Sequence, residues 1–308
     1  MSQNITAGTR RISRFNAFLM LCLITFWGSS FVVVKIVLNE GVTPIAIATY
    51  RFLTAGVLFL IALLANRIRN KQHPLRIRAR DLPTILLLSV TGVTFFFIIQ
   101  YTGIQLGGAS IAAILVCLLS PILITAFSAR IFKEHLMKRQ AAGIGMAALG
   151  TFTVVTGGSM IFQGNSEFLL GSLILLLTPF LWATYTLSGK RIMQKYSPFL
   201  VVSYVNVIGG LLLVPFSLAE NSFTSALALS IYSWLAILFL AVTCSVLGYF
   251  IWFHVMKQVD AAVASSFLFA EPLITALLAV SFVGEKITAF TIIGGMLIFA
   301  GVFLATRK

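Results

Sequence analysis

One acidic residue, Glu271, lies in the middle of a long apolar run, where a carboxylate could handle a proton or a cation. The run extends from about residue 261 to residue 283, which suffices for a membrane-spanning helix of about 20 residues. A charge at that depth costs at least about 2.5 kcal/mol, so it needs a partner, a proton or a water-filled cavity. We interpret Glu271 as a proton- or substrate-handling group. The alternative is a structural carboxylate satisfied by a neighbouring helix.

A second charge, Arg51, lies about seven residues inside another apolar run. At about 1.5 Å per residue, it should lie roughly 10 Å below the end of that helix. One hypothesis is that Arg51 binds a substrate carboxylate while Glu271 handles a proton or an amine. The alternatives are an ion pair between the two, helix carbonyls as their partners, or an Arg51 guanidinium that reaches the membrane interface.

Aromatic and amide side chains inside the apolar runs extend this list of candidate site residues. Aromatic rings with a polar tip can stack on a ligand or on its cationic group, and amides can hydrogen-bond to it. Helix packing is the alternative for each aromatic ring, and bridging between helices is the alternative for each amide. The candidates are Trp27, Trp182, Tyr50, Tyr101, Tyr204, Asn206 and Gln100.

Two prolines inside apolar runs predict helix breaks beside these polar groups. Pro272 follows Glu271, and Pro121 follows Ser120. Proline removes a backbone donor from the helix and favours a kink or a break.

The composition indicates a membrane protein. The chain has 308 residues, of which 59% are hydrophobic and 10% are charged, with a mean hydropathy of +1.02. A soluble domain of this size does not need so much apolar surface. The net charge of +14 could suggest nucleic acid, but the basic residues form short clusters between apolar runs, so we expect no nucleic-acid partner.

Ten apolar runs predict ten transmembrane helices, at about residues 15–38, 44–65, 82–104, 109–132, 141–156, 168–188, 198–218, 232–256, 261–283 and 289–305. Nearly all lysines and arginines outside these runs fall on one side, and Lys35 and Lys286 fall on the other. Because cytoplasmic loops carry the excess of basic residues, both termini are predicted to be cytoplasmic.

The two halves of the chain resemble each other. A shift of about 151 residues places Ser120-Pro121 on Glu271-Pro272, and Gly143 and Gly150 on Gly294 and Gly301; a shift of about 155 places Trp27 on Trp182 and Lys35 on Lys190. We predict a five-helix repeat at residues 15–156, a linker at 157–167 and a second repeat at 168–306. Because five is odd, the second repeat should be inverted, as in many secondary transporters.

These residues also carry a resemblance to a known family. The chain is similar to the EamA type of the drug/metabolite transporter superfamily through Trp27-Gly28-Ser29-Ser30-Phe31, Arg51-Phe52 and the repeated pattern of proline, glutamate and glycine, including Glu285. The resemblance covers roughly residues 17–305. It implies ten helices around a central cavity and export of small metabolites, amino acids or drugs.

The resulting expectation is a transporter of the inner membrane, working by alternating access, with a small-molecule substrate and the lipid bilayer as its partners. Amino acids or related zwitterions are the first choice of substrate, with proton antiport or facilitation as the mechanism. The alternatives are efflux of cationic drugs such as quaternary ammonium compounds and a structural or sensory membrane subunit. No nucleotide-binding, metal-binding or nucleophile-elbow motif occurs, so we expect no enzyme activity, metal or cofactor. The sequence leaves the oligomeric state open.

Overall fold

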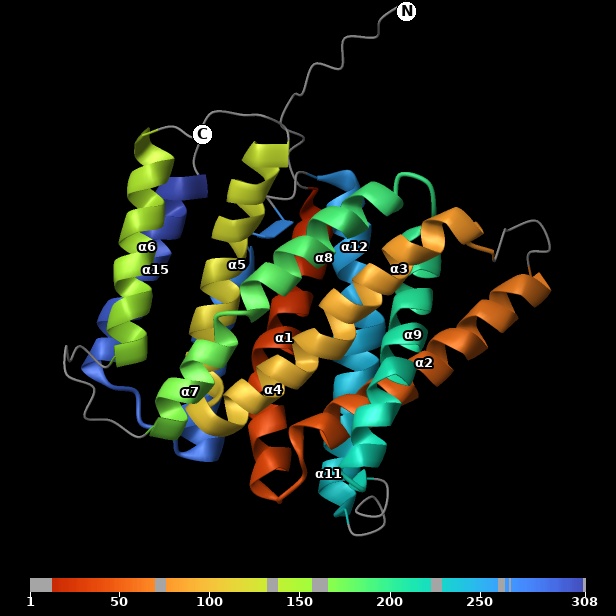
Figure 1. Ribbon diagram of the computed structural model, residues 1–308, viewed down its shortest axis with the longest axis horizontal. Coiled ribbons are helices and arrows are strands. Elements are labelled where there is room, and N and C mark those ends of the chain that lie inside the picture. The colour runs from red at the N-terminus through yellow and green to blue at the C-terminus, as the bar shows by residue number, and fades with distance from the viewer. Residues whose placement is uncertain are drawn as a thin grey trace, which may run out of the picture.

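The computed structural model describes residues 13–69, 76–131, 138–156, 166–222, 229–259, 264–265 and 267–306. Every regular element in these ranges is a helix. Most of the predicted linker, residues 157–165, and the start of the ninth predicted helix, residues 261–263, lie outside the described ranges. The helices run roughly side by side, with the start of α1 and the end of α15 at the same end of the molecule (Figure 1).

The first half of the chain contains α1 (Arg14–Asn39), α2 (Pro44–Arg69), α3 (Leu82–Ser89), α4 (Phe95–Gly107), α5 (Ala109–Ile131) and α6 (Lys138–Thr156). The second half contains α7 (Ser166–Leu175), α8 (Thr178–Ile192), α9 (Pro198–Ala219), α11 (Ile231–Phe239), α12 (Gly248–Gln258), α14 (Glu271–Leu278) and α15 (Ala289–Thr306). Short η segments join several of these: η1 (Ala79–Asp81) and η2 (Val90–Thr94) flank α3, η4 (Leu240–Leu247) joins α11 to α12, and η5 (Phe267–Ala270) and η6 (Ala279–Val283) flank α14.

Helices in equivalent places of the two halves pack against each other in opposite directions. On α6 and α15, a Cβ atom on Gly150 would lie 2.6 Å from the carbonyl oxygen of Gly294, and one on Gly301 would lie 2.5 Å from that of Gly143. On α2 and α9, Gly56 faces Val207 and Gly210 faces Phe52. Because the residue numbers rise on one helix as they fall on the other, both pairs are antiparallel. Glycine permits this close approach of two helices.

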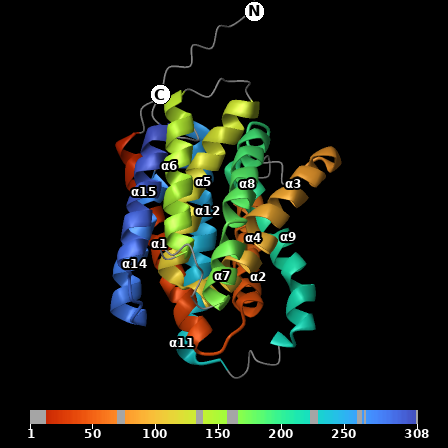
Figure 2. The ribbon, with the colours of Figure 1, turned by 60° about the vertical axis from the view of Figure 1, so that its left-hand side comes forward.

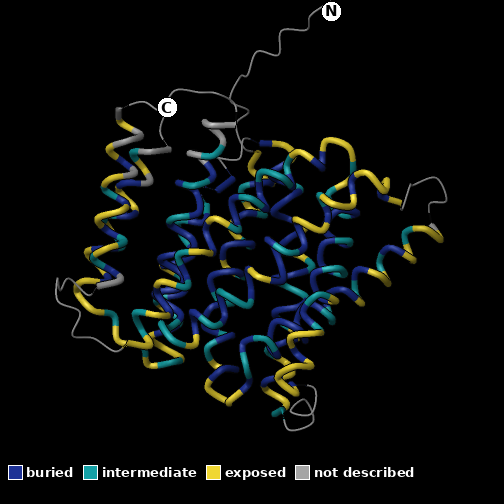
Figure 3. The backbone as a smooth tube through the Cα atoms, in the orientation of Figure 1, coloured by how far each residue is buried: buried dark blue, intermediate teal, exposed yellow. Residues whose placement is uncertain are grey.

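The pair formed by α6 and α15 stands at one edge of the molecule (Figures 1 and 2). The glycines that the repeat places at matching positions therefore lie where these two helices pack closely. Buried residues concentrate in the middle of the helix assembly, and exposed residues gather at the helix ends and on outward-facing sides (Figure 3). Many of the exposed residues are large and apolar, among them Phe18, Ile61 and Phe282, which suits surfaces that face lipid.

Two lysines bind the carbonyl groups at helix C-terminal ends, at matching places in the two halves. The Nζ atom of Lys35 donates to the carbonyls of Ile104 and Gln105, at the C-terminal end of α4. The Nζ atom of Lys190 donates to the carbonyl of Val259, directly after α12. A cation is stabilised at the carbonyl end of a helix because these groups lack intrahelical partners.

Glu285 binds the N-terminal end of a helix. Its carboxylate accepts from the backbone N–H groups of Ala109 at 2.6 Å and Ser110 at 3.0 Å, and from the Ser110 hydroxyl at 2.6 Å. These are the first residues of α5, so the second half caps a helix of the first half. Glu285 therefore bonds to the end of a neighbouring helix.

Three π-helical segments occur in the described part of the chain. In the first half the π segment is η2, and in the second half the π segments are η4 and η6. A π turn leaves carbonyl groups out of the regular ladder and is frequent at functional sites. The Gly92 carbonyl of η2 accepts from the Tyr249 hydroxyl, and the Cys244 carbonyl of η4 accepts from the Trp27 indole.

Six helices in the described ranges are long and apolar enough to cross a membrane, and four more apolar helices are shorter. The long ones include the continuous stretches Ala79–Gly107 and Ile231–Gln258, each made of several segments. The shorter ones are Ala109–Ile124, Gly145–Val154, Phe267–Val283 and Ala289–Gly301. By length and composition, the chain is a multi-pass membrane protein.

Candidate functional site

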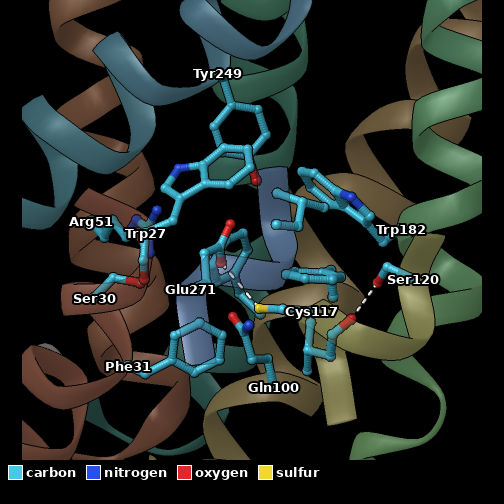
Figure 4. A pocket seen from close by; sticks show the side chains of 14 residues that line it. Trp27, Ser30, Phe31, Arg51, Gln100, Cys117, Ser120, Trp182, Tyr249 and Glu271 are labelled. Carbon is cyan, nitrogen blue, oxygen red and sulfur yellow. Dashed lines mark hydrogen bonds between the residues drawn. The ribbon is translucent and has the colours of Figure 1, made fainter. Parts of the chain in front are cut away.

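A pocket lies between the two halves in the middle of the molecule (Figure 4). It contains about 460 Å³ of space between protein atoms, including space continuous with the outside. The first half supplies Trp27, Ser30, Phe31, Arg51, Phe96, Phe97, Gln100, Val116, Cys117 and Ser120, and the second half supplies Trp182, Tyr249, Leu268 and Glu271.

Arg51 reaches the pocket from α2 with its side chain 2% exposed. Its Nε atom donates to the Ser245 hydroxyl at 2.8 Å, and its Nη1 atom donates to the Tyr101 hydroxyl. The guanidinium carbon lies 4.5 Å from the centre of the Phe97 ring, which holds the charge through a cation–π contact. A guanidinium has five N–H donors. The remaining ones have no acceptor in the described part of the chain.

Glu271 reaches the same pocket from the first turn of α14 with its side chain 3% exposed. Its Oε2 atom accepts from the Cys117 thiol at 3.0 Å (Figure 4). Its Oε1 atom has no hydrogen-bond partner among the described residues. Figure 4 shows this carboxyl group near the centre of the ring of labelled side chains.

The two charged side chains line one pocket without forming an ion pair. No N–O contact within 4.0 Å joins Arg51 to a carboxylate in the described ranges. Burying a charge in a low-dielectric medium is costly unless the charge is compensated. The pocket thus offers a buried cation and a buried carboxyl group, each with free hydrogen-bonding positions. Their helices, α2 and α14, belong to different halves of the chain.

Aromatic rings form much of the wall between the charges. The Trp27 and Trp182 rings meet edge to face with centroids 5.4 Å apart, and the Tyr249 ring lies 6.0 Å from Trp27. Trp27 is held by its bond to the Cys244 carbonyl at 3.0 Å, and Tyr249 by its bond to the Gly92 carbonyl at 2.7 Å. Such rings present apolar faces to a ligand and attract cations.

The structure brings together some of the candidates that the sequence suggested. Trp27, Trp182, Gln100, Arg51 and Glu271 all line the pocket. Tyr101 lies directly behind it and positions Arg51.

Other candidates lie elsewhere. Tyr50 donates to the Ser222 carbonyl at 2.6 Å, its ring packs at a tilt against Trp234, and it does not line the pocket. Asn206 donates to the Val202 carbonyl of its own helix at 2.9 Å. Tyr204 is half-buried on α9 and does not line the pocket.

The two predicted helix breaks differ. Near Pro272, the 3₁₀ turn η5 gives way to α14 at Glu271, with the proline in the first turn, where its missing N–H costs nothing. Near Pro121, helix α5 continues without interruption. Ser120 beside it donates to the Val116 carbonyl, which occupies its hydroxyl within the helix. Pro121 is therefore not a helix end in this conformation.

Sequence reasoning missed several pocket residues, including Tyr249, Cys117 and Phe97. Cys117 is not among the sequence candidates, yet it is the described hydrogen-bond partner of Glu271. The repeat offers a signal for it, because Cys117 lies three residues before Ser120, the counterpart of Glu271. Three or four residues along a helix share a face. In the described ranges, no group of three or more His, Cys, Asp or Glu residues could hold a metal ion.

Comparison with known proteins assigns the chain to a family. The model of the EamA-like transporter family matches residues 14–156 and again residues 169–307. The chain therefore belongs to the EamA-like transporter family, a family of membrane transporters rather than enzymes.

Relatives in other organisms carry transporter names. The chain is 28% identical to an "Uncharacterized transporter" of Archaeoglobus fulgidus, with 94% of this chain and 96% of that protein covered. It is 27% identical to a "Probable amino-acid metabolite efflux pump" of Salmonella typhimurium, with 95% of each covered. It is also 27% identical to the "Uncharacterized inner membrane transporter YedA" of Escherichia coli, with 94% and 90% covered.

A solved structure shares the fold. A protein crystal structure superimposes with a TM-score of 0.64 at 19% sequence identity, with 95% of this chain and 98% of that chain covered.

Proposed function

We propose that this protein is a secondary transporter of the inner membrane that exports small metabolites, with amino acids or related zwitterions as the substrate class. Ten membrane spans, six long and four short, form two inverted repeats at residues 15–156 and 168–306, with both termini in the cytoplasm. The pocket between the repeats opens alternately to the two sides of the membrane.

The observation that carries this proposal is the pair of opposite charges that share the pocket without an ion pair. The free N–H groups of Arg51 suit a substrate carboxylate, because guanidinium and carboxylate match in charge and geometry. The carboxyl group of Glu271 suits the ammonium group at the other end of a zwitterion. Because the two residues belong to different repeats, a bound zwitterion would hold both repeats at once.

The names of two relatives support this proposal. The Salmonella typhimurium relative is named for efflux of amino-acid metabolites, and the Escherichia coli relative for the inner membrane. The excess of Lys and Arg on one side of the predicted spans supports the assigned orientation.

The test is efflux from proteoliposomes loaded with a mixture of labelled amino acids. Arg51→Gln should lower the initial efflux rate about 10- to 100-fold, because a hydrogen bond to a charged group contributes about 1.5–3 kcal/mol. Arg51→Lys keeps the charge and should retain part of the rate. Thermal unfolding of each purified variant controls for misfolding. Normal efflux of every amino acid by folded Arg51→Gln would contradict the proposal.

Glu271→Gln separates the two mechanisms. Under an imposed pH gradient, proton antiport predicts that efflux follows the gradient in the wild type and is lost in the variant. A facilitator predicts efflux that ignores the gradient. Efflux that also survives Glu271→Gln would return Glu271 to a structural role.

A second candidate function is the efflux of cationic drugs, which the aromatic wall beside Glu271 favours. A quaternary ammonium compound has no carboxylate, so its export should survive Arg51→Gln and fail in Glu271→Gln. Growth of cells that overproduce each variant in the presence of such a compound distinguishes the two functions.

A further inference from the structure

Four buried polar atoms beside the pocket have no hydrogen-bond partner in the described part of the chain. All four belong to side chains of α8 and α12: the indole nitrogens of Trp182 and Trp252, the Tyr185 hydroxyl and the Thr186 hydroxyl. Trp182 is 5% exposed and the other three are fully buried. Because residues three and four apart share a helix face, Trp182, Tyr185 and Thr186 lie on the same face of α8.

Three of these side chains, Trp182, Tyr185 and Trp252, form one connected cluster next to the pocket wall, and Thr186 follows Tyr185 on α8. The Trp252 ring lies 5.6 Å from Trp182, and the Tyr185 ring lies 5.3 Å from Trp182. Trp182 itself lines the pocket, so the cluster begins where the pocket ends. It continues along α8 and α12 toward their C-terminal ends, on the side of the molecule where α1 begins (Figure 1).

The cluster is closed in this conformation. The Tyr185 ring is pressed against Gly92, where an added Cβ atom would lie 2.2 Å from the ring. The Phe253 ring is pressed against Gly189 in the same way, at 2.7 Å. Small residues at both contacts let α8 approach η2 and α12 closely, which leaves the polar atoms between rings.

The chemistry of the four atoms identifies what they would bind. An indole N–H is a donor only, and both hydroxyls can donate. A buried polar group without a partner costs about 1–3 kcal/mol. Other polar aromatic groups of the same region do have partners: Trp27 bonds to Cys244, and Tyr249 bonds to Gly92. The unpartnered set therefore needs a hydrogen-bond acceptor.

We propose that Trp182, Tyr185, Thr186 and Trp252 form a second subsite, which receives the carboxylate of the substrate after it leaves Arg51. The subsite opens when α8 and α12 move apart toward their C-terminal ends. This inference rests on the proposed function, because it assumes a substrate with a carboxylate. Water is the other source of an acceptor, and the experiment distinguishes water from the substrate.

The test compares variants that remove the hydrogen-bonding atom and keep the side-chain shape: Tyr185→Phe and Thr186→Val. The labelled amino-acid mixture is used twice, for equilibrium binding to purified protein and for efflux from proteoliposomes. Each variant should bind within about two-fold of the wild type and export about ten-fold more slowly, because one charged hydrogen bond is lost during transit. The melting temperature of the unloaded protein should not fall, because no existing hydrogen bond is removed.

Ser172→Ala is the matched control. The Ser172 hydroxyl on α7 is also fully buried and without a partner among the described residues, but it lies outside the pocket lining. This variant should leave both binding and efflux unchanged.

Two outcomes would overturn the subsite. Efflux at the wild-type rate in both variants would mean that the four atoms serve water or nothing. A melting temperature that falls together with efflux would mean a structural role. Failure of the central site has a different signature, since Arg51→Gln would then bind the mixture as well as the wild type does.

Discussion

Residues at equivalent places of the internal repeat make equivalent contacts at the edge of the molecule, but the charged residues of the central pocket have no charged counterparts. At the edge, Gly143 and Gly150 on α6 meet Gly301 and Gly294 on α15 through equivalent contacts. In the pocket, Arg51 of the first repeat corresponds by the sequence shift to Val205 or Asn206 of the second, and Glu271 corresponds to Ser120. The charged groups of the pocket are therefore not duplicated, although Trp27 and Trp182, which both line it, are counterparts in the repeat.

This difference shows which surfaces of an inverted repeat are constrained by packing between the two halves and which are constrained by a ligand. Two similar halves must keep matching surfaces if they are to pack against each other. Most ligands have no such symmetry, and a zwitterion has unlike ends. A site for it needs unlike groups on the two sides.

The largest expected effect breaks the symmetric contact. Gly150→Val places a side chain against the Gly294 carbonyl, and overpacking of this kind costs at least about 2 kcal/mol. The melting temperature in detergent should fall by roughly 5 °C or more. Gly145 lies on the same helix with no atom within 4 Å of its Cβ position, so Gly145→Val is the control and should melt like the wild type. Equal melting of both variants would show that α6 and α15 are not held together at Gly150.

The next effect tests the asymmetry of the pocket. Asn206 corresponds to Arg51 by the repeat, but its amide donates within its own helix and it does not line the pocket. Asn206→Ala should change efflux less than about three-fold, whereas Arg51→Gln should lower it at least about ten-fold. Initial efflux rates from proteoliposomes check this. A loss in Asn206→Ala as large as that in Arg51→Gln would mean that both repeats contribute polar groups to transport.

A smaller effect tests whether the two lysine caps are equivalent. Lys35→Met and Lys190→Met each remove a cation from a helix C-terminus, where it contributes about 0.3–1 kcal/mol. Both variants should melt slightly and similarly below the wild type. A fall that is confined to one variant would show that the two halves do not use this cap alike.

The smallest effect concerns the loop after α1. The Glu40 carboxylate accepts from the hydroxyls of Ser233 and Ser230, and these bonds lower the pKa of Glu40 below its ordinary value of 4.5. A lowered pKa adds stability at pH values above 4.5, and this contribution is lost as the pH falls through the lowered value. The melting temperature should therefore fall slightly more in the wild type than in Glu40→Gln as the pH is lowered from 6 to 3. Identical pH profiles would show that the contact does not affect stability.

Much of the fold could be predicted from the sequence. The apolar runs, the glycine spacing and the place of Lys35 and Lys190 all depend on local pattern, and local pattern repeats in the second half. Glu271 and Arg51 could be singled out because a charge in an apolar run is unusual wherever the helix lies.

The rest of the site depends on which helices meet, and periodicity does not determine that. Tyr50, Tyr204 and Asn206 have the polarity and depth of pocket residues, but they lie on helix faces that do not line the pocket. Tyr249 and Cys117 look like packing residues until α5, α12 and α14 are brought together. Pro121 was predicted to break its helix, yet an α-helix can continue through a proline when neighbouring groups satisfy the freed carbonyls.

The π segments η2 and η4 change how their helices would respond to the loss of one residue. A π turn holds one residue more than an α turn, and each residue of an α-helix adds about 100° of rotation about the axis. Because the extra residue of a π turn is taken up within that turn, deleting one residue from Val90–Thr94 would restore α winding and leave the helix on either side in phase. Deleting one residue from α4 between Phe97 and Gln100 would instead turn Gln100 by about 100° relative to Phe96 and Phe97. All three side chains line the pocket, so a deletion in η2 should preserve the side chains that a substrate meets, whereas the same deletion in α4 should exchange them.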